Sequence, residues 1–188
     1  MNDIQHLIIL SGPSCSGKTT LINKIKSKKL PLICQQLDIK NPHLCVDLIA
    51  KDFLRMPESL PQNLILHYDI CEHNLHPKEY DYLQLLMAKS RKVDIITLYI
   101  TPKILQQRMR WRLVKKTCVL FLKIKKHRQI LKYLKGNMNK YQLYYRQHNK
   151  LLDMYSDWFA FCQKFDEINH WCIEFKLNEY NIHLKKYK

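Results

Sequence analysis

The ten residues Ser11–Thr20, SGPSCSGKTT, follow the short aliphatic run HLIIL and decide which fold the chain adopts. The whole chain has three glycines, and two of them, Gly12 and Gly17, lie in this stretch. Glycine allows positive φ angles and close approach of the backbone to a ligand, because it has no Cβ. The aliphatic run predicts a buried strand, and the segment KTTLINKIKS, which begins at Lys18, predicts a helix with one apolar face. We therefore expect a strand, a tight loop and a helix in direct succession.

The loop Gly12–Thr19 matches the pattern G-x-x-x-x-G-K-[ST] at every fixed position. Between a strand and a helix, this pattern surrounds phosphate groups with backbone amides at the positive end of the helix dipole. The Lys18 ammonium would neutralise the phosphates, and the Thr19 hydroxyl would ligate Mg²⁺. The residues expected to contact the nucleotide are Gly12, Pro13, Ser14, Cys15, Ser16, Gly17, Lys18, Thr19 and Thr20.

This stretch resembles the phosphate-binding loop of the P-loop NTPase superfamily. It is most similar to the loop of the nucleoside-monophosphate-kinase-like branch, which includes guanylate kinase and small-metabolite kinases. The resemblance implies a three-layer α/β fold with a mostly parallel sheet of about five strands, helices on both faces and a helical lid. It also implies ATP as the phosphoryl donor, with GTP as an alternative, and Mg²⁺ as the metal.

The rest of the sequence alternates between apolar runs and segments of helical periodicity, which indicates a parallel sheet covered on both faces. Further strands are expected at residues 32–38, 63–69, 93–100 and 170–175. Further helices are expected at residues 43–53, 76–90 and 102–113, and over 116–165 with a break at Gly136-Asn137. The length predicts a single domain over residues 1–188, with a basic helical lid or cap at about 102–165.

Asp69 is the candidate for the second metal ligand, the carboxylate that P-loop enzymes carry at the end of a buried strand. It closes the apolar run NLILHYD, which should lie next to the strand that precedes the loop. Asp94 opens its strand and is therefore expected at the opposite edge of the sheet.

The motif QQRMRWR supplies candidate arginines for the lid, directly after the strand at 93–100. Related kinases stabilise charge on the transferring phosphoryl group with such arginines. Neighbouring arginines of the motif lie two positions apart, which is about 200° around a helix. Arg108 and Arg112, four positions apart, share one helix face, so we assign them as the catalytic pair and place Arg110 on another face.

Asp38 is the candidate catalytic base, because a hydroxyl acceptor requires a carboxylate beside it. Asp47 and Asp52 are alternatives for the same role. If the acceptor is itself a phosphate, no base is needed and Arg55 could bind it. The paired acceptor-binding motifs of guanylate kinase are not visible, so the acceptor is an unidentified small molecule.

The net charge of +16 is concentrated in one part of the chain. Residues 95–152 contain fifteen Lys and Arg and no Asp or Glu, whereas the rest of the chain has seventeen bases and sixteen acids. Such a field attracts polyphosphates, nucleic acid or an anionic membrane surface. Nucleic acid is therefore an alternative partner of this segment.

The remaining features exclude several classes of protein. No apolar run approaches the roughly 20 residues that span a bilayer, and the N-terminus does not resemble a signal peptide. The seven cysteines are scattered and form no C-x-x-C pair, which favours reduced thiols and a cytoplasmic location. The guanine-reading motif N-K-x-D of switch GTPases is absent.

The sequence thus favours an enzyme, a Mg²⁺-dependent kinase that transfers the γ-phosphoryl group of ATP to a small acceptor. One alternative is a nucleic-acid-associated NTPase or polynucleotide kinase that uses the acid-free segment to follow a phosphate backbone. Another is a regulatory module that binds a nucleotide, hydrolyses it slowly and is recognised by a partner in that state.

Overall fold

The structure is a computed structural model that describes residues 4–42, 45–49, 61–70, 77–121, 148–174 and 185–186. The strands are β1 (His6–Gly12), β2 (Val46–Ile49), β3 (Asn63–Asp69), β4 (Val93–Tyr99), β5 (Asn169–Glu174) and β6 (Lys185–Lys186). The helices are α1 (Lys18–Lys26), α2 (Pro31–Gln36), α3 (Pro77–Ala88), α4 (Pro102–Phe121) and α6 (His148–Cys162).

The strands form one six-stranded sheet in the order β2-β3-β1-β4-β5-β6. The first five strands in this order pair in parallel, and the two-residue β6 is antiparallel to β5. The predicted α/β class and mostly parallel sheet are confirmed, and the sheet has six strands where about five were expected. Parallel neighbours require crossover connections. Among the described residues, α1 and α2 lie between β1 and β2 in the chain, α3 between β3 and β4, and α4 and α6 between β4 and β5.

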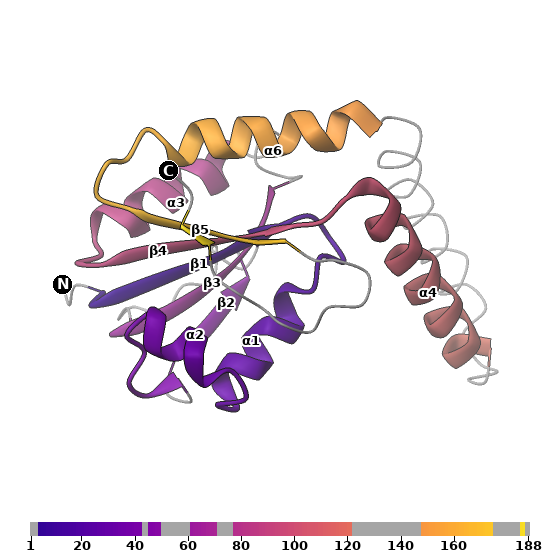
Figure 1. Cartoon of the computed structure of the whole chain (residues 1–188), viewed down its shortest axis with the longest axis horizontal. Helices are drawn as coiled ribbons and strands as arrows, with labels where there is room; N and C mark the ends of the chain where they lie inside the picture. Colours follow the sequence, from indigo (N-terminus) through magenta and orange to yellow (C-terminus); the bar gives the residue numbers. More distant parts are fainter. Residues whose placement is uncertain are drawn as a thin grey trace.

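Helices cover both faces of the sheet (Figure 1). Along β1, Leu7 and Ile9 enter the core shared with α3, α4 and α6, while Ile8 and Leu10 enter the core shared with α1 and α2. A strand buried on both faces needs apolar side chains at every position, which explains why β1 is a continuous aliphatic run. The sheet is therefore the middle of three layers, and its central strands are shielded from water.

The segment 32–38 was expected to be a strand, and this prediction is wrong. Helix α2 covers most of it, with Pro31 at its first position. Proline suits the first turn of a helix, because its φ angle is already helical and its missing N–H is not needed there. Ile33, Cys34 and Leu37 are buried against α1 and the sheet, which is a helical spacing of one and four residues.

The helix expected over 43–53 is also wrong where the structure describes it. Residues Val46–Ile49 form β2, which pairs with β3 through Val46 opposite Leu64 and Leu48 opposite Leu66. A short apolar run is compatible with either structure, and here the open edge of β3 provides a hydrogen-bonding partner. The rest of the expected helix lies outside the described residues.

Two helices, α4 and α6, are described in the region 102–165, which was expected to form a lid or cap. Helix α4 begins at Pro102, as predicted, and projects beyond the carboxyl ends of the strands (Figure 1). Helix α6 instead lies on the sheet, with Tyr155, Trp158 and Phe161 in the core of the upper layer. The Gly136-Asn137 break lies outside the described residues. None of the described helices is long and apolar enough to cross a membrane.

Candidate functional site

The loop Gly12–Thr19 lies at the carboxyl end of β1, beside the carboxyl end of β3. The parallel register pairs Gly12 with Asp69. Helix α1, which follows the loop, packs on one face of the sheet, whereas α3, the next helix after β3, packs on the other (Figure 1). Where the connections of adjacent parallel strands leave toward opposite faces, a crevice opens outside their carboxyl ends, and ligands bind there.

The backbone of the loop requires its glycines. Gly12 has a φ of 147° and Gly17 a φ of 106°, and Cys15 also lies in the left-handed region with a φ of 68°. A Cβ at Gly12 would lie 2.9 Å from Ser16 Oγ and 3.1 Å from the backbone carbonyl oxygen of Leu98. Any larger residue at position 12 would therefore displace the loop or β4.

Gly17 is the N-cap residue of α1 and leaves the first backbone amides of the helix without a side-chain cap. Its own carbonyl already accepts the first helical hydrogen bond, from the amide of Leu21 at 3.0 Å. Uncapped amides and the helix dipole together favour an anion at this point. The side chain of a Ser or Asp N-cap would accept hydrogen bonds from these backbone N–H groups. With glycine at this position, an anion can accept them instead.

The Lys18 side chain is folded back across the loop. It is only 3% exposed, and its Nζ donates hydrogen bonds to the carbonyl oxygens of Gly12 and Pro13, the latter at 2.8 Å. Burying an ammonium group is unfavourable unless hydrogen bonds compensate for its lost hydration. These contacts hold a positive charge inside the curve of the loop.

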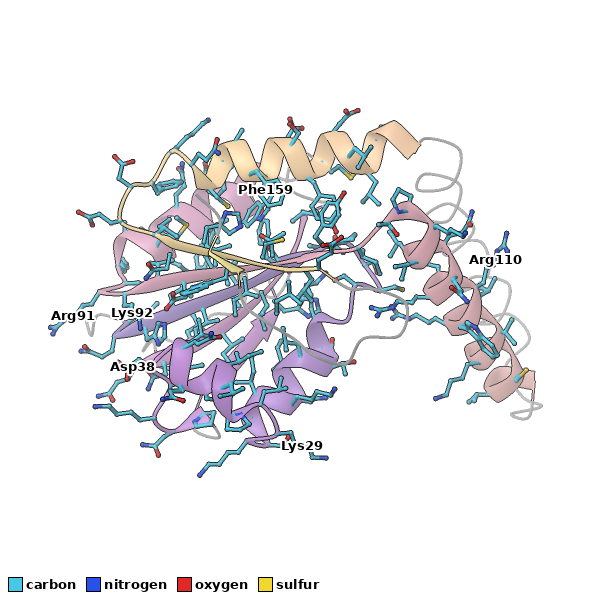
Figure 2. The ribbon with its side chains drawn as sticks, viewed as in Figure 1. Lys29, Asp38, Arg91, Lys92, Arg110 and Phe159 are labelled. Carbon is cyan, nitrogen blue, oxygen red and sulfur yellow. The ribbon has the colours of Figure 1, made fainter. Side chains whose placement is uncertain are left out.

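Two arginines of α4 contact the loop, and they are the two that sequence reasoning paired. Arg108 donates from Nη1 to the Ser16 carbonyl oxygen at 2.8 Å, and Arg112 donates from Nη1 to Cys15 Sγ at 3.2 Å. Arg110 points away from the loop, on the outer side of α4 (Figure 2). Burial lowers the pKa of Arg108 by disfavouring its charged form, and an arginine still keeps its proton at neutral pH.

Ser16 was expected among the residues that contact the ligand, but its hydroxyl was given no role of its own. Among the described residues, its Oγ is a buried side-chain oxygen without a hydrogen-bond partner. An unsatisfied buried hydroxyl costs about 1–3 kcal/mol. The hydroxyl lies inside the loop, beside Gly12. A phosphate bound by the loop would therefore lie where this hydroxyl could donate a hydrogen bond to it, together with the backbone amides. This hydroxyl, the uncapped amides and the three cations together fit an anion such as a phosphate group.

The two residues expected to hold the metal lie at, or shortly after, the carboxyl ends of the central strands. Thr19 is the second residue of α1, and Asp69 ends β3 opposite Gly12. Asp69 is half-buried and Thr19 is exposed. Mg²⁺ in phosphotransfer sites uses one or two protein oxygens together with phosphate oxygens and water. A hydroxyl and a carboxylate at this edge of the sheet fit that requirement.

The structure does not bring Asp38 to this site. Asp38 is exposed at the end of α2, on the side of the molecule where Arg91 and Lys92 precede β4 (Figure 2). A hydrogen bond of 2.9 Å from Lys92 Nζ to the carbonyl of Leu37 fixes it there, at the amino end of β4. Asp38 was assigned to the site because the segment 32–38 was expected to be a strand that ends near the loop. That segment is mostly helix α2, and Asp38 follows the end of this helix. The side chain of Asp47, and Asp52 and Arg55, lie outside the described residues.

Asp94 lies where expected, at the start of β4 and away from the loop. It is buried, and its carboxylate accepts hydrogen bonds from Trp171 Nε1 at 2.9 Å and contacts His6 Nε2 at 2.7 Å. Hydrogen bonds from His6 and Trp171 hold the pKa of Asp94 below its usual value, although burial alone would raise it. This group joins three strands and belongs to the framework of the fold.

A buried polar cluster supports the strand that leads into the loop. Thr97 Oγ1 lies 2.8 Å from Ser11 Oγ and 2.8 Å from His170 Nε2, and it accepts a hydrogen bond from Trp158 Nε1 at 2.9 Å. The cluster ties β1, β4, β5 and α6 together directly beside Gly12. The sequence did not predict this cluster, because one threonine and one histidine in apolar strands form no recognisable motif.

Comparison with known proteins identifies no relative. No protein-family model, curated protein or solved structure matched the chain.

Proposed function

We propose that this protein is a P-loop NTPase of the kinase type, which binds ATP and Mg²⁺ at the loop Gly12–Thr19 and transfers the γ-phosphoryl group to an acceptor. GTP is the alternative donor. One observation carries the proposal: Lys18, Arg108 and Arg112 converge on the loop between a buried parallel strand and the uncapped start of a helix. Three cations and a helix N-terminus at one loop favour a ligand with several negative charges.

The residues divide into roles by position. The loop amides and Lys18 would hold the β- and γ-phosphates, and Thr19 and Asp69 would hold Mg²⁺, which neutralises charge on the phosphates when bound. Arg108 and Arg112, the two arginines that reach the loop from α4, would stabilise charge on the transferring group. Because they hydrogen-bond loop atoms here, we expect them to exchange these partners for phosphate oxygens when a nucleotide binds.

The structure removes one of the candidate catalytic bases. Asp38, the expected base, lies at the opposite edge of the sheet, so the proposal assigns it no catalytic role. A hydroxyl acceptor requires a base, whereas a phosphate acceptor is already a nucleophile. The other candidate bases, Asp47 and Asp52, have side chains outside the described residues, so the proposal covers both a hydroxyl and a phosphate as the accepting group.

The test compares Lys18→Ala and Lys18→Met with the wild type. Calorimetric titration with ATP and Mg²⁺ should show binding that is weaker by about tenfold or more, since a charge-assisted hydrogen bond contributes about 1.5–3 kcal/mol. Release of the γ-phosphate and transfer to a panel of small acceptors, some with a hydroxyl and some with a phosphate as the accepting group, should be lost. Lys29→Ala removes an exposed lysine at the far end of α1 (Figure 2) and should change neither. Unchanged ATP affinity in both folded Lys18 variants would disprove the proposal.

A further inference from the structure

The outer face of α4, which we define as Arg110, Trp111, Val114 and Lys115, has no part in the site described above. Trp111 is 70% exposed and Val114 is 54% exposed, although both are large and apolar. Arg110 and Lys115 are also exposed, the first one residue before Trp111 and the second one helical turn after it. The apolar side chains that anchor the helix, Ile104, Leu105 and Met109, face the core instead. The exposed tryptophan therefore does not serve to pack α4 on the sheet.

The charge around this face selects a polyanion. Helix α4 contains six Lys and Arg and no Asp or Glu, and it lies within the acid-free segment 95–152. A basic surface of this kind attracts a chain of phosphates, and it does so more strongly than it attracts a single charge, because each phosphate contact releases bound counterions. The partner that fits is therefore an extended anion or an anionic surface.

The position of Trp111 distinguishes between these two partners. A helix that binds a membrane surface turns a continuous apolar face to the lipid. Over its whole length α4 separates apolar from charged residues only weakly, and its exposed apolar side chains Trp111, Val114 and Val119 stand among Arg110, Arg112 and Lys115. An exposed aromatic ring between cations is typical of surfaces for single-stranded nucleic acid, where the ring stacks on an unpaired base and the cations contact the backbone.

We propose that the outer face of α4 binds single-stranded nucleic acid, with Trp111 stacked on a base and Arg110 and Lys115 on the flanking phosphates. Arg110 points outward, away from the loop (Figure 2). Arg112, one position from Trp111, contacts Cys15 of the loop. Neighbouring residues of α4 thus belong to the proposed surface and to the contacts with the loop. The binding surface itself stands independently of the phosphotransfer proposed above.

The test is fluorescence anisotropy with a labelled oligothymidylate of about 20 nucleotides, measured on the full chain in about 50 mM and about 200 mM salt. The wild type should bind, and its affinity should fall by at least about fivefold between the two salt concentrations, as expected for two phosphate contacts to a single strand. Trp111→Ala should weaken binding by about tenfold, and Trp111→Phe should weaken it less, because a phenyl ring still stacks.

The charge contribution is tested with a double variant and its matched control. Arg110→Gln with Lys115→Gln should weaken binding and reduce the salt dependence. Lys29→Gln with Lys164→Gln removes two exposed lysines elsewhere and should retain most of the affinity and the salt dependence. Circular dichroism should show unchanged folding in all variants, since the side chains removed are exposed.

Three results would overturn the proposal. One is wild-type protein that binds ATP but not the oligonucleotide. Another is equal oligonucleotide affinity of the wild type and Trp111→Ala. The third is a Trp111→Ala variant that loses binding to vesicles of phosphatidylserine and phosphatidylcholine while it keeps its oligonucleotide affinity, which would make the face a membrane surface. Loss of ATP binding in Lys18→Ala with unchanged oligonucleotide binding would leave the surface intact and separate the two proposals.

Discussion

Arg108 and Ser16 lie 92 positions apart in the chain, and the guanidinium Nη1 of Arg108 donates a hydrogen bond of 2.8 Å to the Ser16 carbonyl oxygen. This contact depends on the order of the strands. Helix α4 follows directly from β4, and β4 is a neighbour of β1, the strand that ends at the loop. Because β4 is a neighbour of β1, the helix that follows β4 begins beside the loop. Arg108 of this helix therefore contacts the loop backbone to which the phosphates are proposed to bind.

Replacing Arg108 by glutamine should slow release of the γ-phosphate by about 10²-fold, with a smaller effect on ATP affinity. Removal of one donor that stabilises developing charge costs about 2.7–4 kcal/mol in other active sites. The measurement is the single-turnover rate constant for phosphate release at saturating ATP and Mg²⁺. Arg91→Gln removes an exposed arginine at the opposite edge of the sheet (Figure 2) and should leave this rate constant unchanged. Equal rates in both variants would remove Arg108 from the proposed mechanism.

Replacing Gly12 by alanine should destabilise the fold by several kcal/mol. Its φ of 147° is strained for any residue with a Cβ, and that Cβ would lie 3.1 Å from the carbonyl oxygen of Leu98, which belongs to the backbone of β4 and has little freedom to move. Urea unfolding measures the loss. Ser16→Ala removes the atom nearest to this Cβ, Ser16 Oγ at 2.9 Å, so combining it with Gly12→Ala should restore only part of the stability. Full restoration would show that backbone strain at position 12 is small.

The loop could be predicted from sequence because its determinants are local. An aliphatic run, two glycines at fixed spacing and a lysine at a helix start occupy one continuous segment, and β1, Gly12, Gly17 and α1 all lie where expected. The pairing of Arg108 with Arg112 was also local, because four positions on a helix are one turn. Both arginines contact the loop.

The errors concern segments whose structure depends on distant partners. Residues 46–49 form a strand because the edge of β3 pairs with them, and helical spacing of apolar residues cannot reveal that partner. The segment 32–38 is a helix, since Pro31 begins it and its apolar residues meet α1. Asp38 was misplaced as a result, because the end of a strand and the end of this helix lie at opposite edges of the sheet.

Replacing Tyr155 by phenylalanine should destabilise the junction between β4 and α4. The Tyr155 hydroxyl donates to the carbonyl of Leu98 at 2.8 Å and accepts from the amide of Ile100 at 3.1 Å, and it is buried. Phenylalanine leaves both backbone groups without this partner, which costs about 1–3 kcal/mol. Thermal unfolding measures the change, and Tyr99→Phe, a half-buried neighbour in β4, is the matched control. Equal melting temperatures in the wild type and Tyr155→Phe would show that this hydroxyl does not hold the junction.

Lowering the pH from 6.5 to 4 should destabilise the fold through His170. Burial lowers the pKa of His170 from 6.5 to about 4, because the folded protein disfavours the imidazolium. Above pH 6.5 both states bind no proton at this residue, and between 6.5 and 4 only the unfolded chain becomes protonated. The free energy of unfolding should therefore fall in this window, by up to about 3 kcal/mol, and the contribution should level off below pH 4.

Replacing His170 by glutamine separates this titration from that of the carboxylates. Glutamine can still hydrogen-bond to Thr97 Oγ1, which lies 2.8 Å from His170 Nε2, but it carries no charge at any of these pH values. The variant is expected to be less stable at pH 7 and to lose less stability between pH 6.5 and 4 than the wild type does. Asp94, whose pKa is lowered, should affect stability only at more acidic pH in both proteins, because its carboxylate remains ionised throughout this window. Urea unfolding followed by circular dichroism at pH 7, 5.5 and 4.5 measures both slopes. If the variant and the wild type lose stability in parallel, the pH dependence originates in groups other than His170.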